Sequence, residues 1–355
     1  DALPISTELT AGRLARVPEL GLMDPAGRAP AGPRPNAWLL PTYDRHALID
    51  ELQQVLNAPG GRLEQTSLYL DDISAGDYLA ISSAPAFLNR FRSLPLEAVA
   101  QLILDEVAGS PLDFVALGPG DGRSETELCK ALLRLQEALA LRVFLLDISH
   151  TLLTHAYGRA RGELPERVTV EALHGDFRQI ARYPVLHRSV SARHRRCYTL
   201  LGGTLANVDN EVLFIRDGLA QSQAGDLAVV DFQCAWADRR DPEAIWRSDP
   251  TLQADPPELH ARWFTGPLRR YGVGVERIKI GVELMTDCLV EGSYELDCYA
   301  DAQRGKEVHR YHLLRVRRYD PAALLATFKR QGWETVQLLR YGPGEMSAVA
   351  LLRRL

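Results

Sequence analysis

The sequence predicts an α/β protein with a Rossmann-like, mostly parallel sheet that ends in a C-terminal antiparallel hairpin, plus a second α+β subdomain. Between residues 114 and 233, apolar runs of strand length alternate with segments of helical periodicity. The last two apolar runs, 334–341 and 346–355, are joined by the short turn GPGE, so they form a hairpin. Residues 238–266 break the alternation, and the two segments after them have the pattern of meandering strands.

Each element of the parallel region follows from its own pattern. The apolar spacing predicts helices over 46–56 and 94–107, before the first strand. Nearly continuous apolar runs indicate strands buried on both faces, and hence helices on both sides of the sheet. The predicted strands are 114–117, 142–147, 167–173, 197–203 and 226–233, and the helices that cover them are 124–138, 149–160, 210–221 and 321–331. The strands predicted after the break are VERIKIGVELM and GSYELDCYA.

Composition and charge exclude several classes of protein. With 46% hydrophobic and 25% charged residues, the chain has the composition of an ordinary globular protein. A net charge of −5 argues against a general nucleic-acid binder. No apolar run approaches the roughly 18 to 20 residues that cross a bilayer, and no signal-like segment opens the chain. We therefore expect a cytoplasmic protein with no membrane partner.

Cysteine and histidine spacing gives no sign of a metal centre. The five cysteines are an odd number without a CxxC pair, which argues against disulfides and structural zinc. His309 and His312 lie close in sequence, but in a strand they point to opposite faces. We expect no bound metal.

The stretch DFVALGPGDGRSETELCKALL, residues 113–133, raises the question of a ligand. An apolar strand breaks into Gly118, Gly120 and Gly122 and then resumes as a helix. Glycines let a ligand approach the main chain closely, and the helix start offers unpaired N–H groups. A strand-to-helix turn also uses glycine without any ligand, so this stretch alone leaves a cofactor site open.

Polar residues follow the next strands at the same predicted edge. In a doubly wound sheet, ligands bind outside the carboxyl ends of the strands. Asp147 is placed to accept hydrogen bonds from a ribose, Asp176 from an adenine amino group, and Phe177 to cover the ring. Taken singly, each residue also has an explanation without a ligand: Asp147 as a helix cap, Asp176 as a turn residue and Phe177 as a core residue. Together with the glycine turn and Asn207, they predict an adenosine-type cofactor.

Two other nucleotide cofactors fit the sequence less well. The GxGxxG fingerprint of NAD enzymes needs glycine where this chain has Arg123, and its acid lies nearer twenty residues on. No GxxxxGK[ST] phosphate loop is present. The terminal hairpin favours S-adenosylmethionine (SAM).

The series LGPGDGRSETELCKALL, FLLDIS, LHGDF and TLLGGTLANV resembles the histidine Nα-methyltransferase family of ergothioneine biosynthesis. The resemblance covers about residues 65 to 235 and implies a class I SAM-dependent methyltransferase. It implies a SAM-binding domain of residues 90–235 and 318–355 and a substrate-recognition subdomain of 41–89 and 236–317. Independently of the resemblance, the Pro-, Gly- and Ala-rich composition of residues 1–40 predicts an N-terminal arm. The implied SAM-binding residues are Gly118, Gly120, Gly122, Asp147, Asp176 and Phe177.

The resemblance also implies an amino-acid substrate. Gly202 and Asn207 would line its pocket, with Asn207 holding the α-amino or carboxylate group and thereby supporting catalysis. Tyr69 and Tyr78 are further candidates for substrate contact, although each fits a core position as well. The implied substrate-binding residues are Tyr69, Leu70, Tyr78, Phe87, Gly202 and Asn207.

The departures from the family pattern argue against histidine as the substrate. Two substrate-contacting tyrosines of the family fall on Leu70 and Phe87, so two hydroxyls are lost. The family strand that supplies Glu and Ser to the imidazole reads YHLLRVRR and has no acid. A polar ligand in such a pocket would leave its groups unpaired. The arginines of this strand leave two interpretations open, a solvated basic face or an anionic-substrate site: Arg315, Arg317 and Arg318.

We therefore expect a SAM-dependent methyltransferase that N-methylates an amino-acid-like small molecule other than histidine. Methyl transfer from a sulfonium is a direct displacement, which fits the absence of a Cys–His or His–Asp nucleophile arrangement. A non-catalytic SAM-binding partner protein, or methylation at O or C of a small metabolite, remains an alternative. An NAD-dependent oxidoreductase and a nucleic-acid methyltransferase are less favoured, the latter supported only by the basic stretch HRSVSARHRR.

Overall fold

The computed structural model describes residues 45–186, 194–235, 258–272 and 274–355. All of them belong to one compact unit, Leu39–Leu355. The arm predicted over residues 1–40 and most of the basic stretch HRSVSARHRR lie outside the described residues, and the interrupted segment 238–266 is described only from residue 258.

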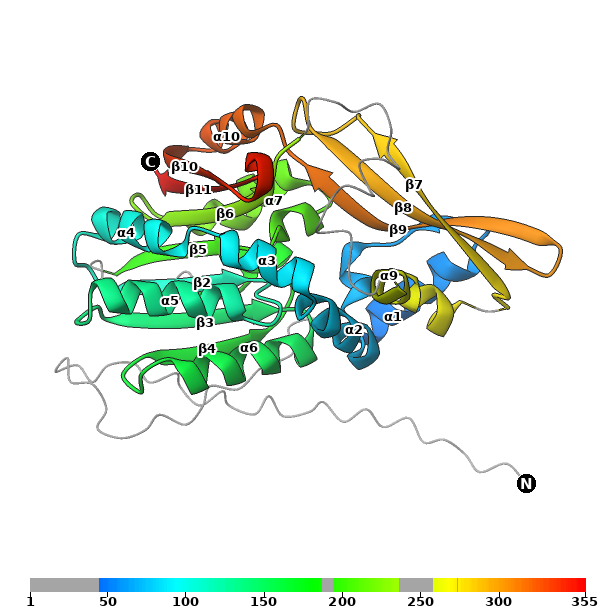
Figure 1. Cartoon of the computed structure of the whole chain (residues 1–355), viewed down its shortest axis with the longest axis horizontal. Coiled ribbons are helices and arrows are strands. Elements are labelled where there is room, and N and C mark those ends of the chain that lie inside the picture. The colour runs from blue at the N-terminus through cyan, green and yellow to red at the C-terminus, as the bar shows by residue number, and fades with distance from the viewer. Residues whose placement is uncertain (1–44, 187–193, 236–257, 273) are drawn as a thin grey trace, which may run out of the picture. The chain divides into compact units, whose positions relative to one another are not determined.

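The central feature is a seven-stranded sheet in the order β10-β11-β6-β5-β2-β3-β4. Five neighbouring strands run parallel, and β11 enters antiparallel between β6 and β10 (Figure 1). The predicted fold class, a Rossmann-like sheet with a C-terminal antiparallel hairpin, is confirmed. The strands are β2 Leu112–Leu117, β3 Leu141–Asp147, β4 Thr169–His174, β5 Arg195–Leu200, β6 Leu227–Gln233, β10 Trp333–Tyr341 and β11 Ser347–Arg354.

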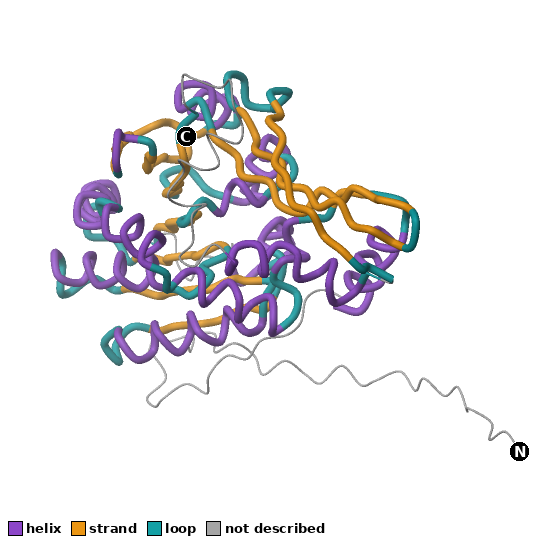
Figure 2. Tube along the Cα trace, turned by 45° about the vertical axis from the view of Figure 1, so that its right-hand side comes forward, coloured by secondary structure: helices purple, strands orange, loops and turns teal. Residues whose placement is uncertain are grey.

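Helices cover both faces of this sheet, as the buried strands require. In β2, Phe114 and Ala116 pack with the core beneath one set of helices, and Val115 and Leu117 with the core beneath the other. Figures 1 and 2 show the first set, α4 Leu96–Val107, α5 Arg123–Leu135 and α6 His150–Glu163, side by side along one face. The opposite face is covered by η2 Phe177–Arg182, η3 Pro184–Leu186, α7 Glu211–Asp217, η5 Gly218–Gln221 and α10 Pro321–Arg330.

A second, four-stranded sheet has the order β1-β9-β8-β7. Its core includes Trp263, Phe264, Tyr311 and Leu314 and lies between the sheet and the neighbouring helices. The strands are β1 Gly61–Arg62, β7 Arg277–Met285, β8 Tyr294–Arg304 and β9 Glu307–Arg318, and the helical segments beside them are α1 Arg45–Asn57, η1 Gln65–Leu68, α2 Asp72–Ser82, α3 Pro85–Ser93 and α9 Glu258–Tyr271.

The end of β9 joins the two sheets. The Tyr319 N–H donates to the Gln233 carbonyl at 2.9 Å, and the Ala235 N–H donates to the Tyr319 carbonyl at 2.8 Å. The carboxyl end of β6 is thereby tied to the end of β9. This connection brings side chains of the second sheet to the edge of the first sheet where ligands bind in such folds.

Three helices were not predicted. Helix α2 begins at Asp71, whose carboxylate accepts from the Ser74 N–H at 2.8 Å, and α3 begins with Pro85 in its first turn. Helix α9 contains Pro267, a residue that usually ends a helix. The helix predicted over 210–221 is instead α7 followed by the 3₁₀ turn η5.

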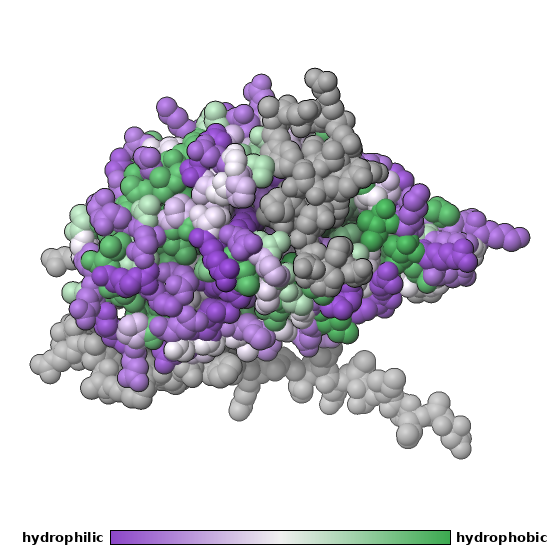
Figure 3. Space-filling model, in the orientation of Figure 1, coloured by the Kyte–Doolittle hydropathy of each residue, from purple (hydrophilic) through white to green (hydrophobic). Residues whose placement is uncertain are grey.

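The described part of the chain contains no helix that is both long enough and apolar enough to cross a membrane. On the face shown in Figure 3, hydrophilic side chains are interspersed with hydrophobic patches.

Candidate active site

A pocket opens at the carboxyl edge of the parallel sheet. On one side it is lined by the turns that follow β2, β3 and β5. On the other side it is lined by side chains of α2, α3, α9 and β9. The pocket therefore has an edge built by the seven-stranded sheet, here called the cofactor edge, and an opposite side built around the second sheet, here called the acceptor wall.

The glycine turn after β2 forms the floor of the cofactor edge. Gly118 has a φ of 60°, and a Cβ there would lie 2.9 Å from Thr204 Cγ2. Gly120 has a φ of 59°, and a Cβ there would approach the Tyr78 hydroxyl at 3.1 Å. Both glycines line the pocket. Their missing side chains leave the main chain open to a ligand.

Gly122 has a different role from the other two glycines. A Cβ on Gly122 would lie 2.6 Å from the Ala156 Cα, so this glycine allows α5 and α6 to pack closely. It does not line the pocket. The structure therefore does not place Gly122 beside the pocket, although the sequence predicted that it would contact the cofactor.

Asp147 lies at the end of β3 and faces the pocket. Its carboxylate accepts from the Ser149 N–H at 2.8 Å and the Gly120 N–H at 3.3 Å. The helix cap is Ser149 and not Asp147, because the Ser149 hydroxyl accepts from the Leu152 N–H. Burial raises the pKa of Asp147 to about 6. The carboxylate has no cationic partner among the described residues, so it retains capacity to accept from ligand hydroxyls.

Phe177 and Asp176 follow β4, and only Phe177 lines the pocket. The Phe177 ring packs edge-on against Phe214 at 5.8 Å between centroids, so it serves the core as well. Asp176 caps η2 and accepts from Arg178, whose Nη2 lies 2.8 Å from Asp176 Oδ2. The Asp176 carboxylate is thus engaged within the protein, and its contact with adenine stays a prediction.

The turn after β5 places Gly202 and Asn207 at the pocket. The Gly202 N–H donates to Asp231 Oδ2 at 2.9 Å, and Asp231 is also held by Arg90 and by the Tyr341 hydroxyl. This network fixes the turn from behind. The side-chain amide of Asn207 hydrogen-bonds the Tyr69 hydroxyl.

Aromatic rings form one part of the acceptor wall. Tyr69 and Tyr78 lie 5.4 Å apart between ring centroids, and Trp263 lies 5.6 Å from Tyr69. Phe87 packs edge-on against Tyr78 at 6.3 Å. These four rings line the pocket, whereas Leu70 is buried outside it. Burial raises the pKa values of both tyrosines well above their usual range, so both hydroxyls stay protonated.

Aliphatic side chains form a second part of the acceptor wall. Ile81 from α2 and Leu314 and Val316 from β9 line the pocket, and all three belong to the same hydrophobic cluster as the four rings. His260 lies beside Trp263, and burial lowers the pKa of His260 to about 4, so its ring is neutral. Ile81, Leu314, Val316 and His260 therefore bring no charge to the pocket.

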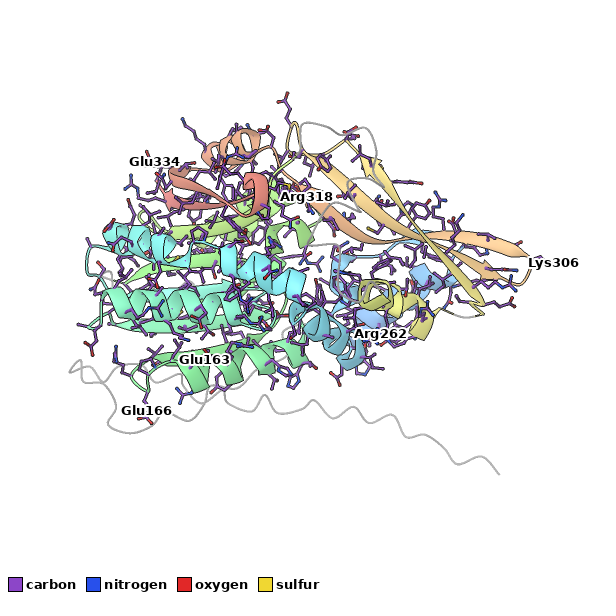
Figure 4. The ribbon with its side chains drawn as sticks, viewed as in Figure 1. Glu163, Glu166, Arg262, Lys306, Arg318 and Glu334 are labelled. Atoms are coloured by element: carbon purple, nitrogen blue, oxygen red, sulfur yellow. The ribbon has the colours of Figure 1, made fainter. Side chains whose placement is uncertain are left out.

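Arg315, Arg317 and Arg318 of β9 are buried, which overturns the interpretation of a solvated basic face. All three line the pocket, and the alternative, an anionic-substrate site, stays a prediction. Arg315 pairs with Asp209, and Arg317 lies 2.7 Å from Glu211 and 2.9 Å from Glu295. Burial, together with the charges of Arg317 and Arg62, lowers the pKa of Arg315 to about 10. Arg318 lies at the junction of β9 with the seven-stranded sheet (Figure 4) and donates to the Arg317 carbonyl. The ion pairs of Arg315 and Arg317 connect β9 to the turn after β5 and to β8.

Several pocket residues were not predicted from the sequence. Glu125 lies at the start of a helix, where acidic residues are common, so its position in the sequence gives no separate signal of a binding role. Trp263, Leu314 and Val316 depend on α9 and on the register of β9, which contains a bulge opposite Cys298. For α9, the apolar spacing of Leu259, Trp263, Phe264 and Leu268 is a helical signal, but most of this helix falls within residues 238–266, which the sequence pattern marked only as a break in the alternation.

The residues present fit the SAM that the motifs imply. The glycine turn leaves room for a close ligand, Asp147 offers a carboxylate at the end of the second parallel strand, and Phe177 offers an aromatic edge. Glu125 adds a buried carboxylate oxygen without a hydrogen-bond partner. A site of this kind can hold a charged nucleoside ligand against the sheet edge and a second ligand against the acceptor wall.

Comparison with known proteins identifies one family profile and several similar solved structures. The profile of the histidine-specific, SAM-dependent methyltransferase family matches residues 52–230, which is half of the chain. No curated protein matches the sequence. The similar solved structures include magnesium protoporphyrin IX methyltransferase (ChlM) of Synechocystis PCC 6803 with bound SAM, at 9% identity over 82% of this chain and 98% of that chain, with a TM-score of 0.45.

Two further solved structures are similar to a comparable degree. Streptomyces venezuelae DesVI is 12% identical over 80% of this chain and 99% of its own, with a TM-score of 0.42. The glycopeptide N-methyltransferase MtfA complexed with sinefungin is 12% identical over 89% of this chain and 99% of its own, with a TM-score of 0.38.

Proposed function

The chain belongs to the family of histidine-specific, SAM-dependent methyltransferases, and we propose that it methylates an amine of an amino-acid-like small molecule other than histidine. We further propose that the acceptor has an apolar or aromatic side chain. The net charge of −5 supports a small molecule over a nucleic acid as the acceptor.

The observation that supports this acceptor class is the composition of the acceptor wall. Leu314, Val316, Ile81, Phe87 and Trp263 supply no hydrogen-bonding group that an imidazole could use, apart from the Trp263 N–H. That N–H already donates to the Leu68 carbonyl at 3.2 Å. An imidazole packed against these five side chains would leave its nitrogens unpaired there, which costs roughly 1 to 3 kcal/mol per group. An apolar side chain has no such cost. The wall also carries cationic guanidinium groups, those of Arg315, Arg317 and Arg318, which cannot accept a hydrogen bond from an imidazole N–H.

Asn207 from the turn after β5 and Tyr69 from the acceptor wall supply neutral polar groups to the pocket. Asn207 and Tyr69 form a hydrogen-bonded pair next to the turn that carries Gly202. Such a pair can orient the amino or carboxylate group of an acceptor through its remaining donor and acceptor atoms. We propose that Asn207 holds the acceptor in this way.

The chemistry requires orientation rather than covalent catalysis. Bound SAM would supply an electrophilic methyl group on a sulfonium. The protein then has to hold an unprotonated amine in line with that methyl group and exclude water. The rings of Tyr69, Tyr78 and Trp263 can line the path and stabilise the cationic ammonium that forms.

The test is methyl transfer from isotopically labelled SAM to a panel of amines, with the position of the label determined by mass spectrometry. The proposal predicts label on the amine nitrogen of an amino acid with an apolar or aromatic side chain. Asn207→Ala should reduce transfer while leaving SAM affinity within about twofold. Label on oxygen or carbon, or no transfer to any amine by a protein that binds SAM, would contradict the N-methylation.

A further inference from the structure

Glu125 is a buried carboxylate for which the described protein supplies no cationic partner. It lies in the first turn of α5, directly after the glycine turn, and is 2% exposed. It lines the pocket, and its Oε2 has no hydrogen-bond partner. Within the described residues Glu125 makes no ion pair, although a buried carboxylate is costly without one.

The charged groups near Glu125 are acidic and further disfavour its ionised form. The groups that act on it are the acidic Asp121, Asp147 and Asp231, which disfavour a second negative charge. The cations nearby are already used, since Arg123 lies 3.1 Å from Asp121 and Arg90 lies 3.2 Å from Asp231. Burial, followed by these acids, raises the pKa of Glu125 to about 8. This corner of the pocket is therefore suited to a cation that arrives with a ligand.

We propose that Glu125 is the binding residue for a primary ammonium group of a ligand in this pocket, and we assign that group to the methionyl portion of SAM. Both SAM and an amine acceptor could supply an aliphatic ammonium. The position of Glu125, one helical turn beyond the glycines that border the cofactor edge, favours the cofactor. The carboxylate would pair with the ammonium through a charge-assisted hydrogen bond.

The test compares cofactor fragments in calorimetric titrations of the Glu125→Gln protein. S-adenosylhomocysteine and decarboxylated SAM carry the ammonium group, whereas 5′-methylthioadenosine has the adenosine and sulfur without it. We expect the substitution to lower affinity for the first two ligands about 10- to 100-fold. Affinity for 5′-methylthioadenosine should change by less than about twofold, which also shows that the variant is folded.

Glu127→Gln is the matched control. Glu127 lies on the same helix, is partly exposed and pairs with Lys130, so its neutralisation changes the net charge by the same amount. This control should bind all three ligands like the unaltered protein. Equal losses in both variants would overturn the proposal, because they would indicate a general charge effect.

The dependence of binding on pH separates an ionic role from a merely structural one. In the unaltered protein, ionisation of Glu125 should raise S-adenosylhomocysteine affinity roughly 5- to 10-fold between pH 7 and 8.5. Asp147 titrates lower, and the other titratable groups of the described residues that face Glu125 are Asp121, Asp231, Tyr78 and Cys129. Glu125→Gln should abolish this rise. Unchanged affinity of Glu125→Gln for S-adenosylhomocysteine would overturn the assignment, even if methyl transfer to the acceptor were slowed.

Discussion

The cofactor edge and the acceptor wall treat charge in opposite ways. At the cofactor edge, Asp147 and Glu125 are buried without a cationic partner among the described residues. In the acceptor wall, Arg315 and Arg317 also line the pocket, but both are paired with acidic side chains, and the groups beside them are aromatic and aliphatic. The charges of these two arginines are therefore balanced within the protein, whereas the carboxylates of the edge are available to a ligand.

The largest effect that we expect from this difference is on stability against pH. The pKa values of Asp147 and Glu125 are raised, to about 6 and about 8, so each group stabilises the fold when protonated. That contribution is fully present below the unfolded pKa values, near 4, and is lost as pH rises through 6 and then 8. Over this window the two groups together should cost a few kcal/mol of unfolding free energy.

Urea unfolding of the ligand-free protein at pH 5, 6.5 and 8.5 measures this effect. Glu125→Gln removes one of the two groups, so its stability relative to the unaltered protein should increase with pH. If the difference in unfolding free energy between Glu125→Gln and the unaltered protein stayed constant with pH, Glu125 would not be a carboxylate without a cationic partner. The contrast in charge between the cofactor edge and the acceptor wall would then be wrong.

Asp147→Ala should have the next largest effect. The substitution removes the carboxylate that accepts from Gly120 and faces the pocket, so S-adenosylhomocysteine affinity should fall about 100-fold, or roughly 3 kcal/mol. Asp147→Asn keeps one acceptor oxygen and should lose less. Calorimetric titration measures the affinity of both variants. Unchanged affinity in Asp147→Ala would contradict the proposal that the cofactor binds at the cofactor edge.

Asn207→Ala probes the acceptor end of the pocket. It removes the amide that hydrogen-bonds Tyr69, so kcat/KM should fall about 30-fold, or roughly 2 kcal/mol. Binding of S-adenosylhomocysteine should stay within about twofold. If cofactor binding and kcat/KM fell together by the same factor, Asn207 would contact the cofactor and not the acceptor.

Val316→Thr should have the smallest effect of the four. The two side chains have nearly the same shape, so the substitution adds one hydroxyl to the acceptor wall without a change in packing volume. KM for an apolar acceptor should rise about fivefold, or roughly 1 kcal/mol, with cofactor affinity unchanged. An unchanged or lower KM would show that Val316 does not contact the acceptor side chain.

The two regions also differ in how far the sequence predicts them. The cofactor edge follows from local signals, since buried strands, glycines and strand-end acids occupy fixed places in a doubly wound sheet. The strand ends at Asp147 and Phe177 were therefore placed correctly at the pocket edge, although the roles of these residues there are still predictions. Gly122 and Asp176 show the limit of this reasoning, because helix packing and a 3₁₀ cap explain their positions equally well.

The acceptor wall depends on tertiary structure that local patterns do not encode. The pocket face of β9 is set by its register with β8, which shifts at a bulge between Cys298 and Tyr299. Trp263 lies on a helix that includes Pro267, and Leu70 and Phe87 look alike in sequence although only Phe87 lines the pocket. Such residues become visible only when strands distant in sequence are assembled.

The most direct test of the central claim is an internal competition for labelled SAM among the twenty amino acids in one reaction, with products resolved by mass spectrometry. Because all acceptors compete for the same enzyme, the product ratio reports the ratio of kcat/KM values. Our account predicts that the label goes to amino acids with apolar or aromatic side chains, about 100-fold in preference to histidine. Preferential labelling of histidine would contradict it.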